Sequence, residues 1–205
     1  MRIRDYGKIL LGLTGNIASG KSLAIKFFDD KIFLRIDSDR LASRHLVENR
    51  DVIVVLKNKF GDEVFDSSNR IDRKKLSQIA FSDREVMKAL EEVIHPLVLK
   101  DVEEMLKTSE RKFVIVESAV LFESGLEGMF DRIITVFAPE ELRVKRLMKR
   151  TGIDYDEAIR RIRFQMSEYL KVSRSDYVID NSRGVVWLKR QVKRVEEDLK
   201  RLGES

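Results

Sequence analysis

With 205 residues, 43% of them hydrophobic, the chain is long enough to bury one main core, and 40 basic against 35 acidic residues leave a net charge of +5. Cysteine is absent, which excludes disulfides and thiolate metal sites, and no apolar run approaches the ~18 residues that a membrane helix needs. Residues 1–5 carry charge without an apolar stretch, so no secretory signal is apparent, and we expect a cytoplasmic protein that binds no membrane.

The first predicted strand, residues 8–14, leads into Gly15-Asn16-Ile17-Ala18-Ser19-Gly20-Lys21-Ser22 and then into a helix to about Asp29. Two glycines that bracket four residues, followed by Lys and Ser, fit the phosphate-loop pattern. A strand, a glycine turn and a helix start aim several backbone N–H groups at one point, which favours a phosphate chain. Lys21 would reach the outer phosphates and the Ser22 hydroxyl would ligate Mg²⁺. The alternative is a chance match; with both flanks in place, we predict a nucleoside triphosphate site.

A second short strand, residues 32–36, ends at Asp37-Ser38-Asp39. Carboxylates at the end of a strand beside a phosphate loop lie where open parallel sheets bind their ligands. Each could touch Mg²⁺ through water or accept a proton from an attacking hydroxyl. The other interpretation is that Ser38 or Asp39 only caps a helix that begins near Arg40. Spacing alone leaves both open.

Residues 39 to 107 are predicted to be helical, with breaks at Gly61 and at residues 66–69. Residues 82–85, Ser-Asp-Arg-Glu, form a capping-box pattern that should open a long helix. Pro96 lies inside that helix and should kink or interrupt it. His95, just before it, either contacts substrate or is a packed or capping residue. The segment carries no strand signal, so we expect a helical insertion between the second and third strands.

Three more strands are predicted at residues 112–117, 132–137 and 177–180, followed by an amphipathic helix at about 185–202. The third ends at Glu117, where phosphate-loop enzymes carry an acid that orders Mg²⁺ and its waters. Five strands separated by helical stretches indicate a parallel α/β sheet covered on both faces.

Arginines cluster between the fourth and fifth strands. Arg143, Arg146 and Arg150 are spaced i, i+3 and i+7, so they share one helical face. After Gly152, a second predicted helix carries two more arginines, Arg160 and Arg163. Guanidinium groups on a hinged helical pair suit a lid that closes over transferring phosphates. The alternative is an exposed basic face.

These stretches together resemble the dephospho-coenzyme A kinase family over essentially the whole chain. Besides the phosphate loop and the step at Asp37–Asp39, the similarity is carried by the stretches at residues 71–76 with Phe81, 94–97, 121–126, 138–142 with Arg146 and Arg150, Gln165-Met166 and 175–182. Two positions depart from the family pattern: Ala119-Val120-Leu121 replaces Pro-Leu-Leu, and Leu23 follows Ser22 where Thr is common.

The resemblance implies ATP- and Mg²⁺-dependent phosphorylation of the ribose 3′-hydroxyl of dephospho-coenzyme A, the last step of coenzyme A synthesis. It implies catalytic roles for Asp39 as general base, Lys21 and Arg146. The implied ATP-binding residues are Gly15, Asn16, Ala18, Ser19, Gly20, Lys21, Ser22, Leu23, Arg150 and Asn181, with Ser22 also on the metal and Asn181 near the adenine. The implied acceptor-side residues are Asp37, Arg73, His95 and Glu117.

The fold implied is a nucleoside-monophosphate-kinase-like α/β domain over residues 1–205, which we expect to be a monomer or small homo-oligomer. We expect a core at about 7–40, 110–140 and 174–205, a helical substrate-binding insertion at about 41–108, and a small helical lid at about 141–172. A kinase for another small acceptor, such as a nucleoside monophosphate, is the nearest alternative.

Two further classes of function fit less well. A GTP-dependent switch needs an Asn-Lys-x-Asp motif, and residues 58–61 fail at its last position. A nucleic-acid-binding module needs a basic stripe with stacking aromatics, whereas the aromatics here mostly lie in apolar strands and helices.

Overall fold

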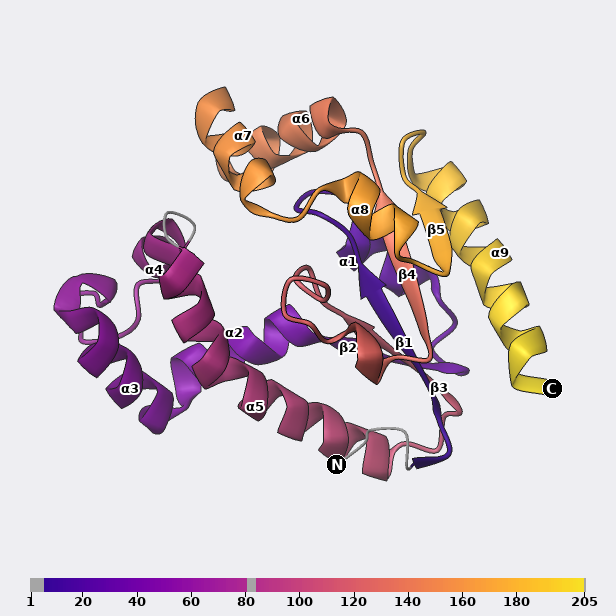
Figure 1. Cartoon of the computed structure of the whole chain (residues 1–205), viewed down its shortest axis with the longest axis horizontal. Coiled ribbons are helices and arrows are strands. Elements are labelled where there is room, and N and C mark those ends of the chain that lie inside the picture. The colour runs from indigo at the N-terminus through magenta and orange to yellow at the C-terminus, as the bar shows by residue number, and fades with distance from the viewer. Residues whose placement is uncertain (1–5, 81–83, 205) are drawn as a thin grey trace. The chain divides into compact units, whose positions relative to one another are not determined.

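The computed structural model describes residues 6–80 and 84–204. Residues 1–5, Phe81 and the first half of the predicted capping box, residues 82–83, therefore lie outside the described residues. The chain divides into two compact units: Met1–Asp37 with Thr108–Ser205 form the first, and Ser38–Lys107 form the second. Figure 1 shows the elements of each.

The first unit is built on five strands, all parallel, in the order β2-β3-β1-β4-β5. Their bounds are β1 Ile9–Thr14, β2 Phe33–Asp37, β3 Phe113–Glu117, β4 Arg132–Phe137 and β5 Tyr177–Asp180. Leu13 and Asp37 are both in register with Glu117, so three strands end at one edge of the sheet. The five strands and their parallel arrangement confirm the fold predicted from sequence.

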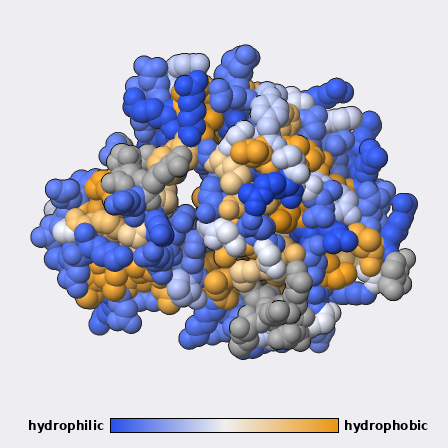
Figure 2. Space-filling view, viewed as in Figure 1, coloured by the Kyte–Doolittle hydropathy of each residue, from blue (hydrophilic) through white to orange (hydrophobic). Residues whose placement is uncertain are grey.

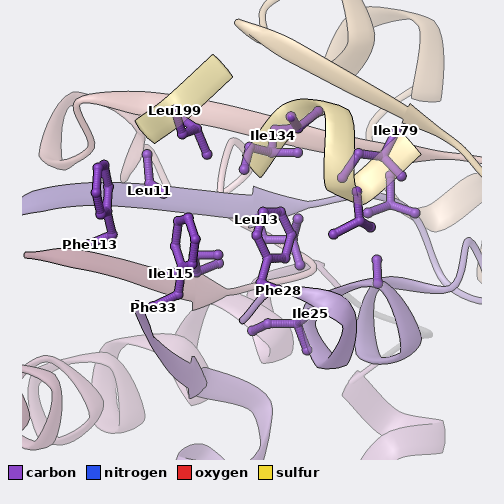
Figure 3. Close-up of a cluster of buried hydrophobic side chains, with 14 of the residues drawn as sticks. Leu11, Leu13, Ile25, Phe28, Phe33, Phe113, Ile115, Ile134, Ile179 and Leu199 are labelled. Carbon is purple, nitrogen blue, oxygen red and sulfur yellow. The ribbon is translucent and has the colours of Figure 1, made fainter. Parts of the chain in front are cut away.

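The core lies on both faces of this sheet. On one face, Leu11 and Leu13 of β1 pack with apolar side chains of α9 (Val185–Glu204), as Figure 3 shows. On the other face, Leu121 and Phe122, which follow β3, pack against β4. A Cβ at Gly12 would clash with Leu121, so this glycine lets the second layer lie directly on β1.

The helix after the phosphate loop is shorter than predicted. α1 (Lys21–Ala24) continues only as a 3₁₀ turn, η2 (Ile25–Phe27), instead of reaching Asp29. Phe28 is extended, and the Arg35 guanidinium donates to the carbonyls of Lys26 and Phe28. A helix end leaves carbonyls without internal partners, and Arg35 of β2 binds two of them here, which stabilises the early end.

The second unit is the predicted helical insertion. It contains α2 (Ser38–Glu48), α3 (Arg50–Phe60), η3 (Gly61–Val64), α4 (Arg73–Ala80) and α5 (Arg84–Thr108), whose last residue belongs to the first unit. The predicted breaks are confirmed: Gly61 has φ +65° after α3, and Asp66 accepts backbone hydrogen bonds from Ser68 and Arg70 in a turn.

Two details of the insertion differ from expectation. Pro96 does not interrupt α5, although its ring nitrogen removes one hydrogen bond inside the helix. The segment is also not wholly helical, because Phe65 and Ile71 form an isolated antiparallel bridge.

Between β4 and β5 lie α6 (Glu140–Thr151), α7 (Tyr155–Phe164) and α8 (Glu168–Ser173), while η4 (Glu127–Met129) precedes β4. Gly152 has φ +71° and ends α6, as its place between two helices predicted. α8 has no counterpart in the sequence prediction. Hydrophilic side chains cover much of the face that Figure 2 shows, with apolar patches among them. Within the described ranges, no helix is long and apolar enough to span a membrane.

Candidate active site

The phosphate loop, Gly15–Ser22, joins β1 to α1 through a backbone that takes positive φ angles at Gly15, Ala18 and Gly20. Gly15 has φ +142° and Gly20 has φ +102°. A Cβ at Gly15 would clash with the carbonyl oxygen of Val136, and one at Gly20 would clash with the Asn181 amide. Ala18 has φ +62°, a left-handed conformation that is costly for a residue with a side chain. The loop is therefore held in one specific, strained shape.

Lys21 lies across this loop. Its ammonium donates to the carbonyl oxygens of Gly15, at 2.9 Å, and of Asn16, at 3.4 Å, and the residue is buried. Two other loop atoms, Asn16 Oδ1 and Ser19 Oγ, are buried without a hydrogen-bond partner in the part of the chain that the structure describes. The Lys21 ammonium and the Ser19 hydroxyl can both donate to an anionic ligand, so this loop is suited to one, whereas Asn16 Oδ1 can only accept.

Ser22, at the end of the loop, contacts the neighbouring strand end. Its hydroxyl donates to Glu117 Oε1 at 2.9 Å, and Glu117 is only 1% exposed. Asp37 is the register partner of Glu117 on β2. The structure therefore brings together Ser22 and Glu117, two of the residues that sequence reasoning singled out, with Asp37 on the adjacent strand.

These oxygens fit a magnesium site. Mg²⁺ prefers hard oxygen ligands and is usually held by one or two protein groups together with water and phosphate. A hydroxyl and a buried carboxylate in contact are such a donor set. Over residues 6–80 and 84–204, no group of three or more His, Cys, Asp and Glu side chains could hold a metal on its own.

Asp39, Arg73 and His95 lie in the second unit, apart in the chain from the phosphate loop. Asp39 is exposed in the first turn of α2, which begins at Ser38, two residues before the predicted start near Arg40. Arg73 is the first residue of α4. His95 is half-buried in α5, and burial lowers the pKa of its imidazole below the ordinary value of 6.5. It is therefore neutral at physiological pH.

The arginines of α6 lie at three different depths. Arg143 is 3% exposed, with an ion pair to Glu168 at 3.1 Å, so it does not belong to the lid face expected from helical spacing. Arg146 is half-buried and donates to the carbonyls of Ser19 and Asn181. Arg150, one turn further, is exposed. Burial lowers the pKa of Arg146, which still leaves a guanidinium charged at neutral pH.

On α7, Arg160 and Arg163 are both exposed, and Arg160 pairs with Glu157 at 2.6 Å. Pairs at i and i+3 are common on solvated helix faces and contribute little. Arg160 is therefore engaged within its own helix in this structure.

Asn181, which follows β5, contacts the backbone of the phosphate loop. Its side-chain amide donates to the Ser19 carbonyl at 2.7 Å, and its own carbonyl accepts from Arg146 at 3.0 Å. Asn181 is 4% exposed. Arg146, Asn181 and Ser19 thus form one contact set that joins α6, the end of β5 and the phosphate loop. Leu23, the next position after Ser22, is exposed on α1.

Sequence reasoning assigned no role to two buried charged residues, Glu168 and Lys171. Glu168 pairs with Arg143, and Lys171 pairs with Glu123 at 2.8 Å. Burial raises the pKa of Glu168 and lowers that of Lys171, against the opposing effect of their partners. Only the i, i+3 spacing of Glu168 and Lys171 was visible in sequence, and it is too common to single them out.

Comparison with known proteins covers both units. A family model described as Dephospho-CoA kinase matches residues 9–186. A Dephospho-CoA kinase of Carboxydothermus hydrogenoformans is 37% identical over 186 residues, which are 89% of this chain and 90% of that protein.

Solved structures agree with the family model. A Thermus thermophilus protein superposes with a TM-score of 0.80 at 37% identity, over 94% of this chain and 98% of that one. A dephospho-CoA kinase from Campylobacter jejuni gives a TM-score of 0.64 at 27% identity, over 95% and 98%.

Proposed function

The chain belongs to the dephospho-CoA kinase family, and we propose how its residues carry out that family's reaction. The enzyme phosphorylates dephospho-CoA in coenzyme A biosynthesis, the activity classified as EC 2.7.1.24. The observation that supports the proposed site best is the meeting of the phosphate loop with a buried acid: Ser22 Oγ lies 2.9 Å from Glu117 Oε1 while Lys21 lies across the same loop. ATP is the phosphate donor.

The loop binds and orients the donor. Backbone N–H groups between Gly15 and Ser22 and the Lys21 ammonium hold the β- and γ-phosphates, because preorganised donors are worth most where negative charge accumulates. Lys21 exchanges its contacts with the loop carbonyls for contacts with phosphate oxygens. Asn181 and Arg146 keep Ser19 and the loop in place while this happens. We place Asn181 and Arg150 on the nucleotide side of the site.

Ser22, with Glu117 beside it, would hold Mg²⁺, and Asp37 on the adjacent strand would contribute to the same site. The metal supplies charge neutralisation on the β- and γ-phosphate oxygens. Glu117 orients the Ser22 hydroxyl, and because Glu117 is buried its Oε1 is held beside that hydroxyl.

Asp39 is the general base. It accepts the proton of the acceptor's ribose 3′-hydroxyl while that oxygen forms its bond to the γ-phosphorus. The bond between the γ-phosphorus and the β–γ bridging oxygen breaks, so ADP leaves with the electron pair. Arg73 and His95 hold the acceptor from the second unit, and Arg146 neutralises charge that develops on the transferred group. Asp39 is exposed in the first turn of α2, two residues after the end of β2, and this position supports the role.

We further propose three functional regions: a core at about 7–40, 110–140 and 174–205, an acceptor-binding insertion at about 41–108 and a lid at about 141–172. The division of the chain at Ser38 and Lys107 supports the insertion, and Gly152 between α6 and α7 supports the lid. We place the enzyme in the cytoplasm, which the absence of cysteine suits, as a monomer or small homo-oligomer that size-exclusion chromatography would identify.

Acceptor specificity tests the proposal. The purified protein is incubated with ATP and Mg²⁺, and ADP formation is measured with dephospho-CoA, AMP, CMP or UMP as acceptor. Turnover with dephospho-CoA should exceed turnover with each nucleoside monophosphate by orders of magnitude. A preference for a monophosphate would make the protein a nucleoside monophosphate kinase instead.

A further inference from the structure

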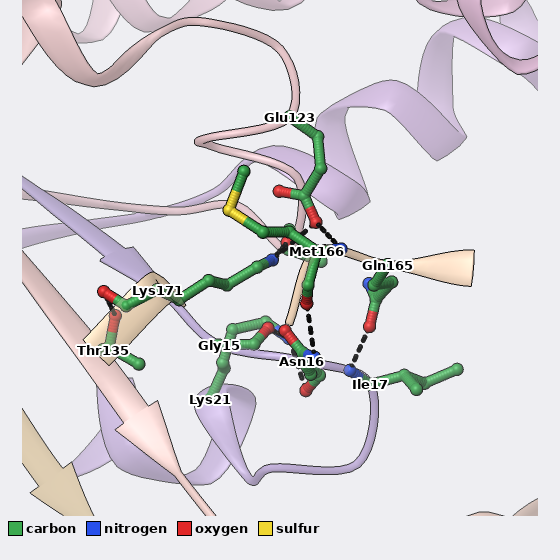
Figure 4. A network of polar contacts seen from close by, with 10 residues as sticks. Gly15, Asn16, Ile17, Lys21, Glu123, Thr135, Gln165, Met166 and Lys171 are labelled. Carbon is green, nitrogen blue, oxygen red and sulfur yellow. Dashed lines mark hydrogen bonds and ion pairs between the residues drawn. The ribbon is translucent and has the colours of Figure 1, made fainter. Parts of the chain in front are cut away.

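Gln165-Met166, the first two of the three residues that connect α7 to α8, form a strap that contacts the phosphate loop twice (Figure 4). The backbone N–H of Ile17 donates to Gln165 Oε1 at 2.6 Å. The side-chain amide of Asn16, which is 2% exposed, donates to the carbonyl of Met166 at 2.9 Å. Two consecutive loop residues are therefore bound by two consecutive strap residues that lie about 150 positions later in the chain.

The strap is itself anchored on its other side. The N–H of Met166 donates to Glu123 Oε1 at 2.9 Å, and the same oxygen pairs with Lys171 Nζ at 2.8 Å. Lys171 is fully buried and also donates to the Ala119 carbonyl at 2.7 Å. Because the Lys171 ammonium is buried, it cannot give up the Glu123 carboxylate without cost, although Glu123 itself reaches the surface, so the pair fixes the position of Glu123. The segment after β3 and α8 thus hold the strap in place.

The phosphate loop needs such support because its conformation is strained. Ala18 adopts φ +62°, which costs a residue with a side chain free energy unless its surroundings enforce it. Ile17 and Ala18 also pack against Leu147 of α6 and Ile162 of α7, the apolar centre of the lid. The strap and the lid helices therefore both contact Ile17; the strap also contacts Asn16, and the lid helices also pack against Ala18.

We propose that Gln165 is a positioning residue for ATP: by accepting the Ile17 N–H, it holds the phosphate loop in the shape that receives the triphosphate. A backbone N–H can only donate, so the amide oxygen of Gln165 must face Ile17 and its NH₂ group must face away. The inference rests on the proposed use of Gly15–Ser22 as the ATP site. It assigns a task to Gln165-Met166 and to Glu123, which the mechanism above does not use.

The contact has an opposite interpretation, in which the Gln165 oxygen stands in for a phosphate oxygen and must leave when ATP binds. The structure favours positioning because the strap is fixed independently of that side chain, through Met166 to Asn16 and to Glu123. The two interpretations predict opposite changes in ATP affinity when the acceptor oxygen is removed.

Gln165→Met removes the acceptor at nearly constant size. We expect the Kd and KM for ATP to rise about 5- to 30-fold, the worth of one hydrogen bond to a partly buried N–H, while the KM for dephospho-CoA stays within about 2-fold. Gln191→Met, a partly buried glutamine on α9, is the matched control and should leave both values unchanged. Unchanged or tighter ATP binding in Gln165→Met would overturn the proposal.

Hydrogen exchange of the Ile17 amide tests the contact without substrate. Exchange should be about 5- to 30-fold faster in Gln165→Met, while amides of β1 and the melting temperature change little. Gln165→Glu keeps an acceptor oxygen, so exchange of the Ile17 amide should stay slow in this variant. This variant also tests the contact if Gln165→Met does not fold. Fast exchange in the Glu variant or in wild type would contradict the proposal. Wild-type turnover of dephospho-CoA reports separately on the proposed function.

Discussion

The hydroxyl of Ser22 lies 2.9 Å from Glu117 Oε1, and this contact joins the end of the phosphate loop to the end of β3. Glu117 is buried, and Asp37 is its register partner on β2. Oxygen-bearing residues from three successive parts of the chain thus meet at the carboxyl edge of the sheet, where parallel α/β folds bind their ligands.

Removing one of these oxygens should change the magnesium requirement. For Ser22→Ala and Glu117→Gln we expect the Mg²⁺ concentration at half-maximal rate to rise about 10- to 100-fold. Ser173→Ala, which removes a hydroxyl that donates to the Leu170 carbonyl within α8, is the control. Rates measured across a Mg²⁺ titration check this, and an unchanged requirement in both variants would place the metal elsewhere.

Asp39→Asn should separate catalysis from binding. We expect ATP affinity to stay nearly constant while turnover falls by roughly 10²–10⁴-fold, the usual worth of general base assistance. Asp156→Asn is the matched control, because Asp156 also lies in the first turn of a helix, α7. Any effect of this control reports the loss of a favourable charge at a helix N-terminus and not a loss of catalysis. Full activity of Asp39→Asn would remove Asp39 from the mechanism.

Arg146→Ala should lower turnover more than it weakens ATP binding, because a lid arginine acts mainly on the transition state. We expect a fall in kcat of roughly 10²-fold or more. Arg160→Ala, whose arginine is exposed and paired with Glu157, is the matched control and should cost little. Steady-state kinetics with an ATP titration measure both effects. Equal kcat in the two variants would mean that Arg146 only holds Ser19 and Asn181 in place.

Gly15→Ala should abolish measurable ATP binding, because the added Cβ clashes with the Val136 carbonyl and φ is +142°. Gly152→Ala also strains a left-handed glycine, at φ +71°, but its Cβ would meet nothing within 4 Å. The control should therefore lose only about 1 kcal/mol of stability and retain ATP affinity. Nucleotide titration of both variants makes the comparison, and normal affinity in Gly15→Ala would show that the loop can rearrange.

Glu157 should make a small, pH-dependent contribution to stability. Hydrogen bonds from Arg161 and Arg160 hold the pKa of Glu157 below its ordinary value of 4.5. The folded state then binds the proton more weakly than the unfolded state, so this stability is present above that value and is lost as pH falls through the lowered pKa. Melting temperatures of wild type and Glu157→Gln should differ at neutral pH and converge in acid; a difference that persists in acid would contradict the assignment.

Local patterns were sufficient to predict the sheet and most helices. Strands such as residues 132–137 are short apolar runs between polar turns, and the phosphate loop has fixed spacing, so both are visible without tertiary information. The end of α1 could not be predicted, because it depends on Arg35 of another element reaching the carbonyls of Lys26 and Phe28.

Two properties of the site could not be predicted from the sequence: how deeply each side chain is buried, and which residues far apart in the chain contact each other. Helical spacing places Arg143 and Arg146 on one face but does not reveal that Arg143 is buried against Glu168. The contact of Gln165 with Ile17 joins residues 148 positions apart, and no local pattern encodes such a pairing. Family resemblance marked Gln165 as notable but gave it no task.

The central claim is that the Gly15–Ser22 loop drives phosphate transfer from ATP to dephospho-CoA, and product formation by wild type and Lys21→Met tests it most directly. Coenzyme A and ADP are quantified by chromatography after incubation with ATP, Mg²⁺ and dephospho-CoA. Wild type should form both products in equal amounts, and Lys21→Met, folded by its melting curve, should form them at least roughly 10²-fold more slowly. No coenzyme A from wild type, or an equal rate from Lys21→Met, would contradict the account.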